Sequence, residues 1–173
     1  MLRQQIPARR IRRLPRRQDA FMLPRPVAGE AGRFVVDATW GRIMPIELAP
    51  GVRSVGELEV IAQIEAGLPV VDTRLPKYLA AGTIPTARYV PHTETADRLD
   101  DFDPSVETIL FCNGPQCAAT PDAIRTLLAA GYPAEGLLYY RGGIHDWVTL
   151  GLPLEPLYTG YADGPERDRI VRT

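Results

Sequence analysis

Short apolar runs alternate with helical patterns along most of the chain. Four of these runs have the length and content of buried β-strands, and they cover residues 68–71, 87–90, 108–111 and 137–140. Between the strands, apolar side chains recur at intervals of three and four residues, most clearly over 55–62 and 123–128. Strands that alternate with helices are typical of a parallel sheet covered on both faces. The pattern therefore predicts an α/β fold.

Local signals indicate where the predicted helices begin and end. Ser54 opens a sequence with the spacing of a capping box, so the first helix is expected to begin there and to stop at Gly67. The helix after the third strand is expected to end at Gly131. Its start is ambiguous, because either Thr120 caps it or the helix begins near Ala118.

Polar segments directly follow three of the predicted strands. They are Asp-Thr-Arg at 72–74, Cys112, and Arg-Gly-Gly at 141–143. In open parallel sheets, ligands bind beyond the carboxyl ends of the strands. We therefore expect these three segments to converge on one rim of the sheet.

Cys112 ends the third strand, and a short loop connects it to the next helix. Loop N–H groups and a helix N-terminus present positive potential there, which lowers the pKa of a thiol. Gly114 allows unusual backbone conformations and Pro115 restricts the loop. The alternative is an inert cysteine buried at a strand end. Spacing alone leaves both interpretations open.

Composition narrows the class of protein. A chain of 173 residues suits one domain with extensions, and it has 45% hydrophobic and 24% charged residues, as ordinary globular proteins do. No apolar run is long enough to cross a membrane. The two cysteines, Cys112 and Cys117, are too few for a disulfide framework or a four-cysteine zinc site. No apolar signal-peptide core follows the arginine pairs near the start, so we expect a cytoplasmic protein.

Charge is divided unevenly along the chain. Residues 1–33 hold nine arginines against two acidic residues, a net charge of +7, and the remainder carries −8. Prolines interrupt this basic head, which we interpret as a disordered extension in preference to an arm that binds nucleic acid. Residues 34–53 are expected to form a connector or edge segment, and residues 156–173 a C-terminal tail.

Three motifs together resemble the rhodanese-like family. They are VVDTRLPKYLAAGTIPTARYVP at 70–91, ILFCNGPQCAAT at 109–120 and GLLYYRGGIHDWVTLGLPLE at 136–155. Their order and spacing are those of a single rhodanese-like domain, which we place at 54–155. The resemblance implies a three-layer sandwich around a five-stranded parallel sheet. One departure is Thr86, which stands where the family usually has glycine.

The resemblance also implies roles for individual residues. Cys112 matches the nucleophile that carries a persulfide. Asp72 and Arg74 match a pair that supports the site, and Arg141 is a candidate substrate contact. The loop whose N–H groups would hold the sulfane sulfur comprises Asn113, Gly114, Pro115, Gln116, Cys117 and Ala118.

The implied activity is sulfur transfer. A donor such as thiosulfate, a persulfide or a polysulfide would load Cys112, and a thiol, cyanide or a protein sulfur carrier would accept the sulfur, with no metal or organic cofactor. The loop lacks the basic residue often found in members that use thiosulfate. A cysteine-dependent phosphatase would need arginine at position 118, which is alanine. A non-enzymatic interaction module and a redox sensor that uses Cys112 and Cys117 are the remaining alternatives.

Overall fold

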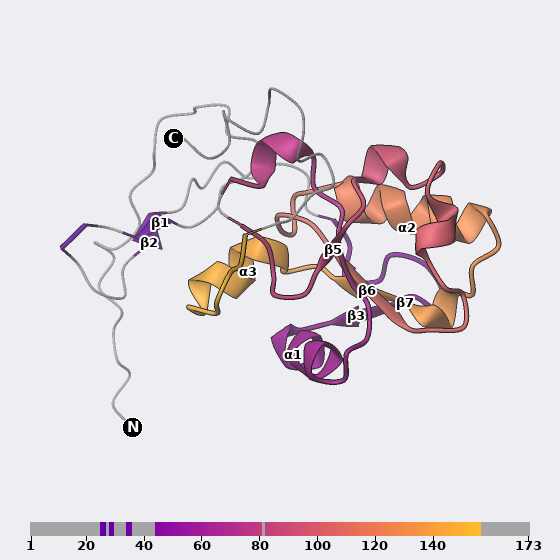
Figure 1. The fold of residues 1–173 in the computed structure, drawn as a ribbon, viewed down its shortest axis with the longest axis horizontal. Coiled ribbons are helices and arrows are strands. Elements are labelled where there is room, and N and C mark those ends of the chain that lie inside the picture. The colour runs from indigo at the N-terminus through magenta and orange to yellow at the C-terminus, as the bar shows by residue number, and fades with distance from the viewer. Residues whose placement is uncertain (1–24, 27, 30–33, 36–43, 81, 157–173) are drawn as a thin grey trace.

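The computed structural model describes residues 25–26, 28–29, 34–35, 44–80 and 82–156 (Figure 1). Most of the predicted basic extension and nearly all of the predicted C-terminal tail lie outside these residues. Two short segments pair in antiparallel fashion, β1 (Arg25–Pro26) and β2 (Phe34–Val35). The remaining described residues contain a second, larger sheet with its covering helices.

Five strands form this larger sheet in the order β3-β7-β6-β4-β5, and every neighbouring pair is parallel. The strands are β3 (Arg53–Val55), β4 (Val70–Asp72), β5 (Arg88–Tyr89), β6 (Thr108–Phe111) and β7 (Leu137–Tyr140). The predicted α/β fold with a five-stranded parallel sheet is confirmed. The central strand β6 and its neighbour β7 begin and end at the predicted residues, and both are buried along their whole length.

Helices cover both faces of the sheet (Figure 1). They are α1 (Glu57–Glu65), α2 (Ala119–Ala129) and α3 (Gly143–Thr149), with short 3₁₀ helices η2 (Pro76–Tyr78), η3 (His92–Glu94), η4 (Leu99–Asp101) and η5 (Ala134–Gly136). On β4, Val71 packs in the cluster that includes α2, whereas Val70 packs in the cluster that includes α1 and α3. This alternation along one strand separates the two cores of a three-layer sandwich.

The start of the first helix was predicted wrongly. Ser54 lies in β3, where it pairs with Tyr139 of β7. The helix begins only at Glu57, and the N–H of Gly56 donates to the Glu59 carboxylate at 2.9 Å. As a result Leu58, which belonged to the predicted apolar face, is 80% exposed. The predicted end is confirmed, because the helix stops before Gly67, whose φ is +67°.

The second of the two predicted starts of α2 is correct. Ala118 is the N-cap, and its carbonyl accepts the Asp122 N–H at 2.9 Å. Pro121 falls in the first turn, where the missing N–H has no helical partner to lose. Only residues 113–118 therefore separate Cys112 from the helix, which keeps the loop short. In the described part of the chain, no helix is long and apolar enough to cross a membrane.

Candidate active site

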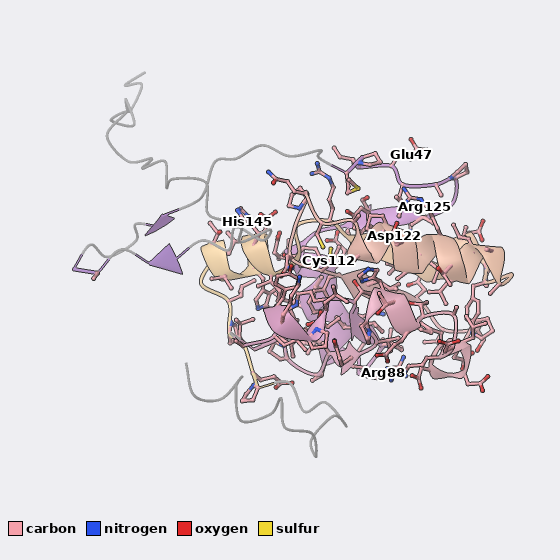
Figure 2. The ribbon with its side chains drawn as sticks, turned by 90° about the horizontal axis from the view of Figure 1, so that it is seen from above. Glu47, Arg88, Cys112, Asp122, Arg125 and His145 are labelled. Carbon is pink, nitrogen blue, oxygen red and sulfur yellow. The ribbon has the colours of Figure 1, made fainter. Side chains whose placement is uncertain are left out.

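The three polar segments meet around Cys112, as the sequence predicted. From the end of β4, Thr73 donates its N–H at 3.0 Å and its hydroxyl at 2.8 Å to the carbonyl of Phe111. From the start of α3, which directly follows Arg141 and Gly142, the Ile144 N–H donates to the Cys112 carbonyl at 3.0 Å. Figure 2 shows Cys112 between α3, which carries His145, and α2. The carboxyl ends of β4, β6 and β7 thus surround one thiol.

Gly143 allows the β7 turn to lie directly on the cysteine loop. Its φ is +57°, which disfavours residues with a side chain. A Cβ at this position would overlap the carbonyl oxygen of Cys112 and would lie 2.9 Å from the Gly114 nitrogen. The second glycine of the pair, Gly143, is therefore required for close approach of two backbones.

The Cys112 thiol is enclosed, with only 1% of the residue exposed. Its S–H donates to the Cys117 carbonyl at 3.5 Å. Burial, together with the neighbouring Cys117 side chain, raises the pKa of Cys112 well above its ordinary value, although the hydroxyl and N–H of Thr120 oppose this. The lowered pKa that the loop position predicted is not found at this cysteine.

The lowered pKa is found at Cys117 instead. A hydrogen bond from the Cys112 thiol, the N–H groups of Asn113 and Ala119, and the charge of Arg74 together lower the pKa of Cys117 to about 7, against the opposing effect of burial. The positive potential of the loop therefore acts mainly on its second cysteine. The neighbouring thiols therefore differ, because Cys112 holds its proton more tightly than Cys117 does.

Met44, in the segment upstream of the sheet, is hydrogen-bonded both to the cysteine loop and to Arg141 after β7. The Met44 N–H donates to the Pro115 carbonyl at 2.7 Å, and the Met44 carbonyl accepts from Nε of Arg141 at 2.8 Å. Within the loop, the Cys117 N–H donates to the Gly114 carbonyl at 2.9 Å. Arg141, which was predicted as a substrate contact, thus uses its Nε to bind a backbone carbonyl. Nothing in the sequence around Met44 indicated this role.

Asp72 and Arg74 form an ion pair in which both side chains are fully buried. Arg74 binds both carboxylate oxygens, with Nη2 to Oδ2 at 2.6 Å and Nε to Oδ1 at 2.9 Å. Its remaining donors reach the carbonyls of Tyr78 and Gly82, at 2.8 and 2.7 Å. The Thr83 hydroxyl adds a bond to Asp72 at 2.7 Å. The pair therefore holds the segment after β4 in place beside the cysteine loop.

A cavity of about 260 Å³ opens beside this loop. Its walls combine loop residues with the first turn of α2 and with η2 and η3. They include Asn113, Gln116, Cys117, Tyr78, His92 and Asp122. Cys117 lines the cavity, whereas Cys112 packs against Cys117 and is not part of the wall. Across the described residues, no three side chains of the metal-binding types come together as a metal site.

Comparisons with known proteins agree with this architecture. The family model of the rhodanese-like domain matches residues 57–150. A full-length protein from Lactobacillus plantarum shares the fold with a TM-score of 0.53 at 21% identity, over 60% of this chain and 88% of its own. The thiosulfate sulfurtransferase of Pseudomonas aeruginosa aligns with a TM-score of 0.50 at 28% identity, over 64% of this chain and 21% of its own.

A curated relative has a different description. The HTH-type transcriptional regulator Rv0324 of Mycobacterium tuberculosis is 34% identical over 98 residues, which are 56% of this chain and 42% of that protein. The chain thus spans less than half the length of this relative. The family match itself covers more than half of the 173 residues, and the chain belongs to the rhodanese-like domain family.

Proposed function

We propose that this protein is a sulfurtransferase that carries sulfane sulfur as a persulfide on Cys112. The observation that supports this most directly is the position of Cys112, at the carboxyl end of β6 and at the start of a tight loop within the family match. The similarity to the Pseudomonas aeruginosa thiosulfate sulfurtransferase also favours it. The donor would be thiosulfate, a persulfide or a polysulfide, and the acceptor a thiol, cyanide or a protein sulfur carrier.

The thiol pair provides a route for the proton in the first half-reaction. Near neutral pH Cys117 is partly a thiolate, and it packs against Cys112 in one buried cluster. Cys117 takes the proton as Cys112 attacks the outer sulfur of the donor. The donor's sulfur–sulfur bond breaks, and its inner group leaves with the electron pair. In the second half-reaction, an acceptor thiolate attacks the outer sulfur of the persulfide and Cys112 leaves as the thiolate.

Charges around the loop favour a donor of low charge. Residues 113–118 carry no charged side chain. Arg74 is neutralised by Asp72, and Nε of Arg141 is bound to the Met44 carbonyl. An organic persulfide, whose sulfur end carries at most one negative charge, therefore fits this site better than doubly charged thiosulfate, since a dianion needs compensating cations when it leaves water.

Intact-mass spectrometry tests the proposed carrier. The reduced protein is mixed without oxygen with glutathione persulfide or thiosulfate and sampled at early times. The wild type near pH 7, and Cys117→Ser at a pH raised enough to ionise its Cys112 thiol, should each gain the mass of one sulfur atom, with the faster gain from the persulfide. Cys112→Ser should gain none. A sulfur atom retained by Cys112→Ser, or its absence from folded Cys117→Ser, would contradict the proposal.

The relative with a regulator's description supports a second candidate, a domain that senses sulfane sulfur without turning it over. Multiple-turnover assays separate the two functions. A sulfurtransferase should transfer many equivalents of sulfur per protein to an excess of acceptor thiol. A sensor should take up a single equivalent and then stop.

A further inference from the structure

We propose that Cys117 is a resolving cysteine, which attacks the Cys112 persulfide, forms a Cys112–Cys117 disulfide and releases the outer sulfur as sulfide. The inference rests on the proposed persulfide at Cys112. It adds a second outcome for bound sulfur, because the domain would reduce the sulfur as well as transfer it.

The geometry of the loop favours direct reaction between the two cysteines. Both are buried in one cluster with Ala119, and the Cys112 S–H donates to the carbonyl of Cys117 at 3.5 Å. The turn from Gly114 to Cys117 is closed by a backbone hydrogen bond, and α2 begins soon afterwards at Ala119. The two sulfur atoms are therefore held as neighbours by backbone that is already ordered.

The electronic properties of the pair give each cysteine a different role. The N–H groups of Asn113 and Ala119 favour the thiolate of Cys117, whose pKa is about 7. An attacking thiol reacts best when its pKa is close to the ambient pH. Burial disfavours a free thiolate at Cys112, so once Cys112 carries the sulfur, Cys117 is the thiol of the pair that is available to attack.

The chemical step is balanced without an additional oxidant. The Cys117 thiolate attacks Sγ of Cys112, the bond from Sγ to the outer sulfur breaks, and hydrosulfide leaves with the electron pair. The outer sulfur is thereby reduced, and the two cysteine sulfurs are oxidised to a disulfide. Two equivalents of an external thiol, or one dithiol reductant, then restore both cysteines.

The cavity gives that reductant access to the disulfide. Cys117 lines it and Cys112 does not, so an incoming thiolate would meet the sulfur of Cys117 first. Attack there would release the Cys112 sulfur, which is the carrier needed for the next cycle. The arrangement thus suits repeated conversion of donor sulfur to sulfide, with external thiol as the electron source.

A labelling experiment tests the resolving role. Reduced full-length protein is treated without oxygen with one equivalent of glutathione persulfide labelled in its outer sulfur. Both cysteines lie in the tryptic peptide 99–125, so an internal disulfide appears as the loss of two hydrogen atoms from that peptide. The wild type should form this disulfide and release labelled sulfide in equal amount. Cys117→Ser, loaded at a pH high enough to ionise its Cys112 thiol, should keep the labelled sulfur on Cys112 and release none.

The controls separate failure of this inference from failure of the proposed function. A wild-type protein that keeps its persulfide, with neither disulfide nor labelled sulfide, overturns the resolving role and leaves the carrier role intact. Label on Cys112→Ser, or no label on Cys117→Ser, overturns the carrier role. If the carrier role fails, oxidation of the wild type with diamide tests whether Cys112 and Cys117 can form a disulfide without a persulfide. Absence of the internal disulfide after this oxidation overturns the inference. Cys117→Ala replaces Cys117→Ser if the serine variant does not fold.

Discussion

Arg74 binds both carboxylate oxygens of Asp72 in a place where neither side chain is exposed. The guanidinium also donates to the backbone carbonyls of Tyr78 and Gly82, so a single buried cation holds the end of β4 and these two residues together. Every charge and most donors of the pair are satisfied within the domain. The pair is thus a structural support, and its removal should lower the free energy of unfolding substantially.

Replacement of Asp72 by Asn should destabilise the protein strongly, because Arg74 is left as a buried cation without its counter-ion. Breaking such a pair costs about 3–5 kcal/mol. The matched control is Arg53→Ala, which removes an ion pair to Glu107 whose side chains are both more than half exposed. Exposed pairs contribute at most about 1 kcal/mol. Urea denaturation of both variants measures the difference, and equal losses would show that the buried pair is not a support.

Replacement of Gly143 by Ala should disrupt the active site. The added Cβ would overlap the Cys112 carbonyl, and the positive φ adds strain. We expect a loss of persulfide loading of at least tenfold, together with lower stability. Gly151→Ala is the matched control, since φ there is +73° and nothing lies within 4 Å of the added Cβ. Gly151→Ala should lower the free energy of unfolding only by about 1–2 kcal/mol, the cost of the backbone strain. Its folded molecules should load persulfide normally.

Persulfide loading should depend on pH through the thiol pair. Loading needs a thiolate, so its rate should rise as the pH increases through about 7, where Cys117 loses its proton. In Cys117→Ser the remaining thiol is Cys112, whose pKa is raised by burial, and the midpoint should therefore move to higher pH. Stopped-flow loading rates at several pH values measure both curves. Identical midpoints in the two proteins would show that Cys117 does not accept the proton.

Replacement of Thr86 by Gly should stabilise the protein. Thr86 is the one non-glycine residue with positive φ in the described part of the chain, at +64°. A left-handed conformation costs an L-residue about 1–2 kcal/mol, and glycine avoids most of this cost. Thr86→Ala keeps the strain and serves as the control. Thermal denaturation should rank Thr86→Gly above both other proteins, and a lower melting temperature for the glycine variant would contradict this account.

Strands and helices with strong local patterns were predictable from the sequence. The apolar stretches that form β6 and β7 are buried on both faces, so their apolar composition alone was enough to indicate buried strands. Strand β3 was missed because Arg53, Ser54 and Val55 include a single apolar side chain. What makes them a strand is hydrogen bonding to Leu138, Tyr139 and Tyr140 of β7, far along the chain. Local patterns carry no information about such distant pairing.

The chemistry of the cysteine loop was only partly predictable. Spacing and strand order predicted that the thiol of Cys112 would lie at the rim, and it does. Which thiol has the lower pKa depends on the direction of individual N–H groups and on burial, and both are fixed by tertiary structure. The N–H groups of Asn113 and Ala119 favour the Cys117 thiolate, whereas Cys112 is enclosed.

Met44 helps to hold the candidate active site together, although it lies outside the residues that match the family. The family match starts at residue 57, yet a residue thirteen positions earlier holds both the cysteine loop, through Pro115, and the turn after β7, through Arg141. A shortened protein that begins at the family boundary would leave a loop carbonyl and an arginine without their partner. A molecule that binds the upstream segment and displaces Met44 would therefore alter the reactivity of the thiols. Because such coupling is reciprocal, sulfur bound at the thiols would in turn alter the binding of that molecule.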